Sequence, residues 1–165
     1  MVAFQALILR LRNLSMNNTL DFDDFNVDGK KILLVTTIWN KELLKPLLDE
    51  ISSHASSANV EIITEYCPGS LELAATLKKK MLDISFDGVM AVGLVIRGDT
   101  PHFKLVSRQA YSDLAKVALE NQTIPLINGV LTVDNKVQAE ERINPTKMNK
   151  GKEFIQSLFQ MISSR

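Results

Sequence analysis

The sequence predicts an α/β domain with a four-stranded parallel sheet and helices on both faces. The alternation of strands and helices supports this fold class, and chain length and composition support a single globular domain. Apolar, β-branched runs alternate with amphipathic stretches of helical length from about residue 30 onward. At 165 residues the chain has room for one domain with a sizeable core. Its composition, 45% hydrophobic and 23% charged, is typical of a globular protein.

The first half of the chain predicts two strand–helix units. Residues 31–38, KILLVTTI, form a continuous apolar run, which is typical of a strand covered on both faces. Residues 41–55 place leucines at helical spacing, although Pro46 must lie in the first turn of this helix or kink it. Residues 60–67, VEIITEYC, predict a second strand, and residues 70–82 predict a helix after a Pro-Gly turn.

The second half repeats this pattern. Residues 86–96, FDGVMAVGLVI, predict a third, buried strand, and residues 102–122 predict the longest helix. Residues 124–132 predict a fourth strand, followed by a short helix around Gln138 and a last helix over residues 150–162. Repeated βαβ units imply right-handed crossovers, and ligands in such folds bind beyond the carboxyl ends of the strands. Candidate functional residues are therefore those that directly follow each strand.

Charge and cysteine content exclude several classes of protein. Acidic and basic residues balance at 19 each, so no excess of cations is available for a nucleic-acid backbone, and no nucleic-acid partner is expected. The single cysteine, Cys67, excludes an intrachain disulfide and favours a reducing compartment, which we expect to be the cytoplasm. With two histidines and one cysteine, a Cys/His zinc cluster is not expected.

The first fifteen residues, MVAFQALILRLRNLS, are apolar and basic. Arg10 and Arg12 interrupt the apolar run, which is too short to span a bilayer, and no small-residue cleavage site follows. No membrane partner is therefore expected. We expect residues 1–16 to form a poorly ordered or oligomer-docking extension to a single domain over residues 17–165, and Met16 offers an alternative start.

Polar and aromatic residues follow the first two strands. Trp39 and Asn40 come after the first strand. A tryptophan at a strand end usually packs in the core or at its rim, but an indole at the ligand edge can also stack on a planar heterocycle. After the second strand, the stretch CPGSLE opens a helix whose free amides can donate to ring carbonyls or an anionic edge. Glu72 in that turn has two possible roles. Its carboxylate either accepts hydrogen bonds from N–H and O–H groups of a ligand or stabilises the helix through a favourable interaction with the helix dipole.

The third strand ends in the stretch VIRGDTPHF. Thr100 fits the N-cap of the next helix, with a proline at the first helical position. Gly98 lets the backbone turn tightly and lets a ligand approach. The amides of this helix start form an anion cradle suited to phosphate, to which Asp99 is expected to contribute its backbone while its side chain points away. His102 beside the cradle would carry protons, or is incidental to a capped helix start.

Taken together, four motifs resemble those of the lumazine synthase family, which catalyses the penultimate step of riboflavin biosynthesis. They occur in family order at strand ends, and the resemblance covers residues 30–162. The motifs are VIRGDTPHF, CPGSLELA, NGVLTVDNKVQAEER and NKG. The resemblance implies a flavodoxin-like three-layer sandwich. It also implies condensation of 5-amino-6-(D-ribitylamino)uracil with 3,4-dihydroxy-2-butanone 4-phosphate to 6,7-dimethyl-8-ribityllumazine, phosphate and water, with no metal or organic cofactor.

The resemblance also implies roles for individual residues. His102 matches the catalytic histidine. The phosphate group is expected to contact Asp99, Thr100 and Arg142. The pyrimidine and its ribityl chain are expected to contact a larger set, which comprises Trp39, Asn40, Ser70, Leu71, Glu72, Leu94, Val95, Ile96, Asn128 and Lys150.

The chain departs from the family pattern at three places. Asn128 stands where many members carry a phenylalanine that covers the pyrimidine, and Leu71 replaces a common aromatic. Residues 143–148, INPTKM, replace a glycine-containing connection of shell-forming members. The resemblance implies a homopentamer whose subunits share active sites, with Asn128, Arg142 and Lys150 reaching the neighbour's pocket. The third departure favours the pentamer over a larger shell. Riboflavin synthase is a further partner that the resemblance suggests.

Other functions on the same fold class predict different residues. A flavodoxin-type electron carrier should have a hydroxyl-rich phosphate loop after the first strand, where this chain has TTIWNK. A phospho-receiver domain should have paired acidic residues after KILLV, and none is present there. A non-catalytic flavin- or lumazine-binding paralogue would keep the same pocket, and it is the alternative to an enzyme.

Overall fold

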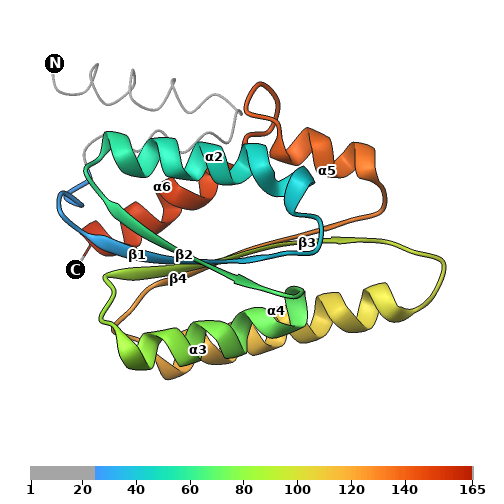
Figure 1. Ribbon diagram of the computed structural model, residues 1–165, viewed down its shortest axis with the longest axis horizontal. Helices are drawn as coiled ribbons and strands as arrows, with labels where there is room; N and C mark the ends of the chain where they lie inside the picture. Colours follow the sequence, from blue (N-terminus) through green and yellow to red (C-terminus); the bar gives the residue numbers. More distant parts are fainter. Residues whose placement is uncertain (1–24, 165) are drawn as a thin grey trace, which may run out of the picture.

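The four apolar runs pair into one parallel sheet at the centre of the structure (Figure 1). The computed structural model describes residues 25–164. Neighbouring strands of the sheet pair in the order β2-β1-β3-β4. The strands are β1 (Lys31–Thr37), β2 (Glu61–Cys67), β3 (Gly88–Ile96) and β4 (Leu126–Val133). The predicted four-stranded parallel sheet is confirmed.

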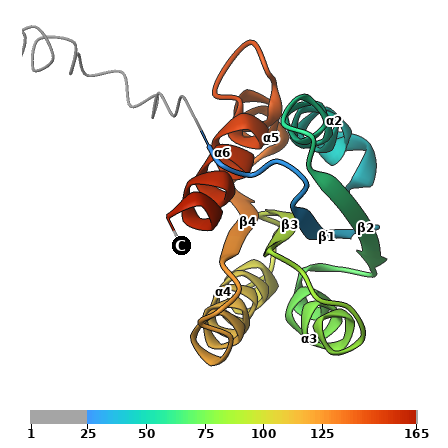
Figure 2. The ribbon, with the colours of Figure 1, turned by 90° about the vertical axis from the view of Figure 1, so that its left-hand side faces the viewer.

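Helices cover both faces of the sheet and complete a three-layer sandwich (Figure 2). Their bounds are α2 (Lys41–Ser57), the 3-10 turn η1 (Ser70–Glu72), α3 (Leu73–Asp83), α4 (His102–Glu120), α5 (Lys136–Ile143) and α6 (Lys150–Ser163). The helices α2, α5 and α6 lie on one face, and α3 and α4 lie on the other. The fold class expected from the alternation of strands and helices is therefore confirmed.

Two hydrophobic clusters fill the space between the sheet and the helices. Ile32 and Leu34 of β1 belong to the cluster under α2 and α6, whereas Leu33 and Val35 belong to the cluster under α3 and α4. All four are at most 1% exposed. Burial on both faces explains why the run is continuously apolar and does not alternate with polar residues. The carboxyl ends of the central strands thus rest on a packed core.

Pro46 lies inside α2, beyond the first turn of this helix. Of the two alternatives given for Pro46, a place in the first turn is therefore excluded, and the kink stays a prediction. Its side chain is exposed, so the ring takes no space from the core, and its main cost is the backbone hydrogen bond that a proline nitrogen cannot donate. The buried residues Leu44, Leu47 and Ile51 hold this helix on the sheet.

The N-terminal extension expected over residues 1–16, with the alternative start at Met16, lies outside the described residues. The expected domain over residues 17–165 is described from residue 25 to residue 164. Among the helices in this range, none is both long and apolar enough to cross a membrane. The same range contains no group of three or more His, Cys, Asp and Glu side chains that could hold a metal ion.

Candidate functional site

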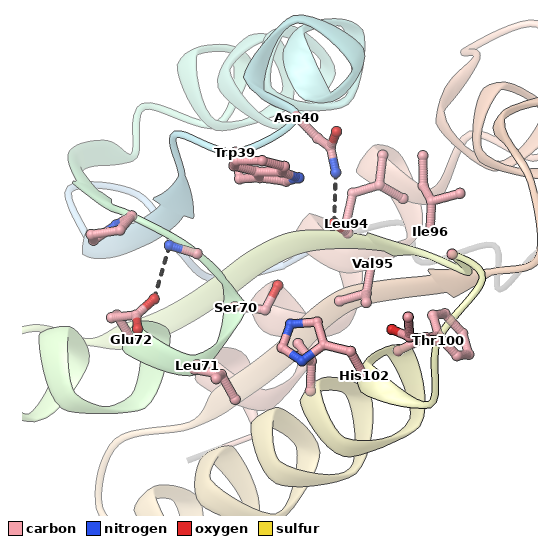
Figure 3. Close-up of a pocket in the computed structure, with 15 residues that line it drawn as sticks. Trp39, Asn40, Ser70, Leu71, Glu72, Leu94, Val95, Ile96, Thr100 and His102 are labelled. Carbon is pink, nitrogen blue, oxygen red and sulfur yellow. Dashed lines mark hydrogen bonds between the residues drawn. The ribbon is translucent and has the colours of Figure 1, made fainter.

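A pocket of about 530 Å³ lies at the carboxyl edge of the sheet (Figure 3). Its walls come from four segments, namely the turn after β1, the turn η1 after β2, the end of β3 and the start of α4. Ten predicted site residues line it: Trp39, Asn40, Ser70, Leu71, Glu72, Leu94, Val95, Ile96, Thr100 and His102. The structure thus brings together residues that are up to 63 positions apart in the sequence, from Trp39 to His102.

The sequence interpretation missed two apolar residues of the pocket wall, Phe103 and Val106. Both lie in the first two turns of α4. A signal for Val106 was available, because this residue is four positions after His102 and so lies on the same side of the helix. They add an apolar floor beside the imidazole.

Backbone hydrogen bonds after β1 fix Trp39 at the pocket rim. The Trp39 amide donates to the carbonyl of Pro68 at 3.1 Å, and the Thr37 hydroxyl donates to the carbonyl of Trp39 at 2.8 Å. The residue itself is 74% exposed. Core packing is therefore not the role of Trp39 in the isolated chain, and its ring is available for a flat ligand.

Asn40 links the ends of two strands. Its backbone is in the left-handed region, with φ of 64°, which asparagine tolerates better than most residues. Its Nδ2 donates to the carbonyl of Leu94 at the end of β3, at 3.0 Å. Asn40 thereby ties the turn after β1 to the strand end that carries Val95 and Ile96.

The turn after β2 holds a carboxylate at the pocket. Glu72 Oε2 accepts a hydrogen bond from the Gly69 amide at 3.0 Å, so this carboxylate satisfies the backbone of its own turn. Its other oxygen makes no hydrogen bond with the described residues. Ser70 is 9% exposed and packs closely against β3, where a Cβ on Gly93 would lie 2.9 Å from Ser70 Oγ. The glycine leaves room for this turn to approach the sheet.

Cys67 lies at the end of β2, next to this turn, but is poorly suited to nucleophilic chemistry. The residue is buried, and its Sγ donates to the carbonyl of Gly69 at 3.4 Å. Burial, together with the negative charge of Glu72, raises the pKa of the Cys67 thiol to about 11. The thiol is therefore protonated near neutral pH, whereas the reactive form of a cysteine is the thiolate.

The start of α4 forms the opposite wall of the pocket from Trp39 (Figure 3). The backbone amides of Asp99, Thr100 and His102 make no hydrogen bond with any described residue. The His102 side chain is exposed and likewise unpaired within residues 25–164. Free amides at a helix start attract anions.

Two details of this segment differ from the prediction. Thr100 does not cap α4. The residue directly before the helix is Pro101, which already has helical backbone angles, and no side chain caps this end. Gly98 is not in the left-handed region, so the turn does not require a glycine. No atom lies within 4 Å of the position that a Cβ on Gly98 would occupy. This open space is still consistent with close approach of a ligand.

Four predicted site residues do not line the pocket of their own chain: Asp99, Asn128, Arg142 and Lys150. Asp99 is exposed beside the pocket. Asn128 Oδ1 accepts a hydrogen bond from its own strand, the Val130 amide, at 3.0 Å. Arg142 Nη1 donates to the carbonyl of Gln138 at 3.0 Å. Lys150 Nζ lies 2.5 Å from the carboxylate of Glu153. That Asn128, Arg142 and Lys150 reach a neighbour's pocket stays a prediction.

The NKG motif around Lys150 has a structural explanation for its other two residues. Asn149, with φ of 47°, accepts from the Lys152 amide and donates to Glu50 Oε1 of α2 at 2.9 Å. A Cβ on Gly151 would lie 2.7 Å from the carbonyl oxygen of Leu47, so only glycine allows α6 to approach α2 this closely. Lys150 is thus the first residue of a helix whose N-terminus is fixed against α2.

Comparisons with known proteins agree on one family. The model of the family "6,7-dimethyl-8-ribityllumazine synthase" matches residues 29–165. Proteins named 6,7-dimethyl-8-ribityllumazine synthase are similar to this chain over most of its length. The one from Chlorobaculum tepidum is 38% identical over 130 residues, covering 76% of this chain and 83% of its own. That from Chlorobium phaeobacteroides is 35% identical over 139 residues, covering 82% and 88%. That from Blochmanniella pennsylvanica is 38% identical over 126 residues, covering 75% and 78%.

Proposed function

Because the chain belongs to the 6,7-dimethyl-8-ribityllumazine synthase family, we propose that its pocket condenses 5-amino-6-(D-ribitylamino)uracil with 3,4-dihydroxy-2-butanone 4-phosphate. The products are 6,7-dimethyl-8-ribityllumazine, phosphate and water, and the reaction is the penultimate step of riboflavin biosynthesis. One observation carries the assignment of the reaction to this pocket. An exposed indole and a helix start with unpaired amides form its two opposite walls.

The pyrimidine binds on the Trp39 side. Its ring stacks on the exposed indole, and the backbone at Val95 and Ile96 contacts its polar edge. Asn40 supports this edge, because its Nδ2 already holds the Leu94 carbonyl, while its Oδ1 is left to accept from the ligand. The free oxygen of Glu72 accepts from a ribityl hydroxyl, and Ser70 and Leu71 complete the wall.

The phosphorylated ketone binds on the α4 side. Its phosphate accepts hydrogen bonds from the unpaired amides of Asp99, Thr100 and His102, where the helix dipole also favours negative charge. Arg142 of a neighbouring subunit supplies a positive charge that the chain's own pocket lacks. Asp99 is exposed and lies outside the pocket lining, so the proposal assigns only its backbone amide, and not its carboxylate, to the phosphate.

The reaction needs proton transfers and a site for the leaving group. The uracil amine attacks the ketone, and the adduct loses water to give an imine. Elimination then releases phosphate, and ring closure with loss of a second water gives the product. His102 carries protons in these steps, because its imidazole is exposed and lines the pocket beside the unpaired amides of the helix start. Holding both substrates together supplies much of the rate.

We propose a homopentamer with active sites between subunits. Asn128, Arg142 and Lys150 do not line the pocket of their own chain, and in this proposal they complete a neighbour's. Exposed apolar side chains at the pocket rim and on α4, such as Trp39 and Leu105, would be covered by such contacts. The INPTKM connection, which lacks the glycines of shell-forming members, favours the pentamer over a larger shell. Such rings use head-to-tail contacts that close on themselves.

Two further parts of the proposal concern the setting of the enzyme. We place it in the cytoplasm, because its single cysteine is a buried free thiol that needs no oxidising compartment. Riboflavin synthase is the partner proposed for association, since it consumes the lumazine product. Co-purification with riboflavin synthase would test this second part.

Incubation of the purified chain with both substrates tests the proposed function. Lumazine absorbance and fluorescence should appear with release of one phosphate per product. Omission of either substrate is the control. Tight binding of the lumazine product without any turnover would contradict the proposal and identify the chain as a non-catalytic binding paralogue.

A further inference from the structure

Arg97, the first residue after β3, makes three contacts that no step of the proposed reaction uses. Its amide donates to the carbonyl of Val133 at the end of β4, at 2.9 Å. Its side-chain Nε lies 2.5 Å from Asp134 Oδ1. Its guanidinium carbon also lies 4.8 Å from the centroid of the Phe103 ring. One side chain thus joins the end of β3, the turn after β4 and the first turn of α4.

The acidic partner of Arg97 is fixed by its own turn. The Asp134 amide donates to Gln138 Oε1 at 2.9 Å, and the Gln138 amide in turn donates to Asn135 Oδ1 at 3.0 Å. These two bonds hold the turn between β4 and α5. Asp134 is therefore a firm anchor although its side chain is 57% exposed.

The segment between Arg97 and Phe103 has no comparable support of its own. The amides of Asp99, Thr100 and His102 are unpaired among the described residues, and the Thr100 hydroxyl caps nothing. The segment is consequently held mainly at its two ends. Arg97 acts on both ends. Its backbone directly follows β3 and donates a hydrogen bond to β4, and its guanidinium packs on Phe103, the residue next to His102.

We propose that Arg97 is a positioning residue that holds the phosphate side of the pocket. A guanidinium suits this task, because its planar face can stack on Phe103 while its edge binds the carboxylate of Asp134. Arg97 does not itself line the pocket. This role rests on the proposed function, which assigns residues 98–102 to the phosphorylated ketone. A direct contact between Arg97 and the phosphate is the competing explanation.

Steady-state kinetics of Arg97→Gln, Arg97→Lys and Asp134→Asn, with each substrate varied in turn, test this role. Arg97→Gln loses the ion pair and the ring contact, so kcat/KM for the phosphorylated ketone should fall about tenfold. Asp134→Asn loses the ion pair alone and should cause a fall of about threefold. Arg97→Lys keeps the charge and should recover part of the loss. KM for the pyrimidine should not change, because Trp39 and Asn40 lie on the other wall.

The matched control is Lys78→Gln, which breaks an ion pair of similar exposure between α3 and α4. Lys78 Nζ lies 2.8 Å from Glu120 Oε2, and the two side chains are 55% and 56% exposed. Neither residue lines the pocket. This variant should keep the kinetics of the wild type. Melting temperatures of all variants should lie close together, since every substituted residue is exposed.

The outcomes separate the possible explanations. If the wild type turns over and Arg97→Gln behaves like Lys78→Gln, Arg97 positions nothing, while the proposed function stands. If Arg97→Gln is impaired but Asp134→Asn is not, the ion pair to Asp134 anchors nothing, and the positioning role proposed for it is wrong. Equal losses for both substrates, with a lowered melting temperature, would show a general structural role and also overturn it. A wild type without turnover would instead overturn the proposed function.

Discussion

Replacement of Gly93 by alanine should disturb the pyrimidine side of the pocket from inside the sheet. Gly93 lies in β3, directly behind Ser70. A Cβ there would meet Ser70 Oγ at 2.9 Å, Leu73 Cδ1 at 3.3 Å and Thr37 Cγ2 at 3.4 Å. The first distance is too short for a stable contact, and because Ser70 is almost buried, we expect the turn η1 to move outward by a few tenths of an ångström. This movement would carry Ser70, Leu71 and Glu72 with it.

The expected change in the free energy of unfolding has two opposed contributions. Overpacking of a well-filled site costs about 1–3 kcal/mol. Burial of the added methyl group returns about 0.8 kcal/mol. The free energy of unfolding should therefore fall by about 1 kcal/mol, which corresponds to roughly 2–5 °C in melting temperature for a domain of this size. The same displacement should raise KM for the pyrimidine more than KM for the phosphorylated ketone.

Gly98→Ala is the matched control for stability. A Cβ added to Gly98 would meet no atom within 4 Å, and the residue is not in the left-handed region. Alanine there should leave the melting temperature unchanged or raise it slightly, because it restricts the unfolded chain. For both variants, thermal denaturation gives the melting temperature, and steady-state kinetics with varied pyrimidine give KM for this substrate. A Gly93→Ala protein with wild-type stability and wild-type KM would refute the close packing of η1 against β3.

Three further predictions concern single side chains. Trp39→Ala should weaken binding of the lumazine product by about 1 kcal/mol or more, and product should quench the indole fluorescence of the wild type; unquenched emission at saturation would place Trp39 outside the site. His102→Ala should lower turnover by about a hundredfold while largely sparing product binding; a wild-type rate at neutral pH would contradict the proton-transfer role. The hydrogen bond from Asn149 holds the pKa of Glu50 below its ordinary value. A carboxyl of this kind stabilises the fold above its unfolded pKa of about 4.3 and loses this contribution as the pH falls through its lower folded pKa. The urea midpoint of Glu50→Gln should accordingly fall less steeply in that range than that of the wild type, and equal slopes would contradict the assignment.

The strands were predictable because each is a continuous apolar run in a doubly covered sheet. Even so, β3 begins at Gly88, two residues after the predicted start at Phe86. Phe86 is 5% exposed, but it packs in the core from the loop before the strand. Hydrophobicity reports burial, whereas a strand boundary depends on backbone pairing, so the sequence pattern extended this strand too far.

Contacts between distant segments were not predictable. Glu50 and Asn149 are 99 positions apart, and nothing in the local pattern of either residue indicates that they share a hydrogen bond. The stretch VIRGDTPHF pointed to the phosphate side of the pocket, but it gave no role to Arg97, because Asp134 is 37 positions further on. The predicted cap of α4 at Thr100 was wrong because Thr-Pro is a common helix start, whereas here no side chain caps the helix.

Most candidate site residues were predictable because parallel strands bring their carboxyl ends to one edge. Trp39, Glu72 and His102 each follow a strand and line one pocket. Arg142 and Lys150 also follow β4 in the sequence, but they lie on α5 and α6 and do not line that pocket. Chain order alone cannot distinguish a residue that serves its own pocket from one that serves a neighbour's.

Subunit complementation tests the central claim, a lumazine-forming pocket shared between neighbouring subunits, most directly. His102→Ala chains and Arg142→Ala chains, each impaired alone, are unfolded together in equal amounts, refolded and assayed for lumazine formation. If the two residues come from adjacent subunits, random mixing restores an intact pair to about a quarter of the sites in a closed ring. Activity should therefore rise well above that of either parent. Mixed rings, confirmed by mass, that stay as impaired as their parents would place His102 and Arg142 in one subunit's pocket and contradict the shared site.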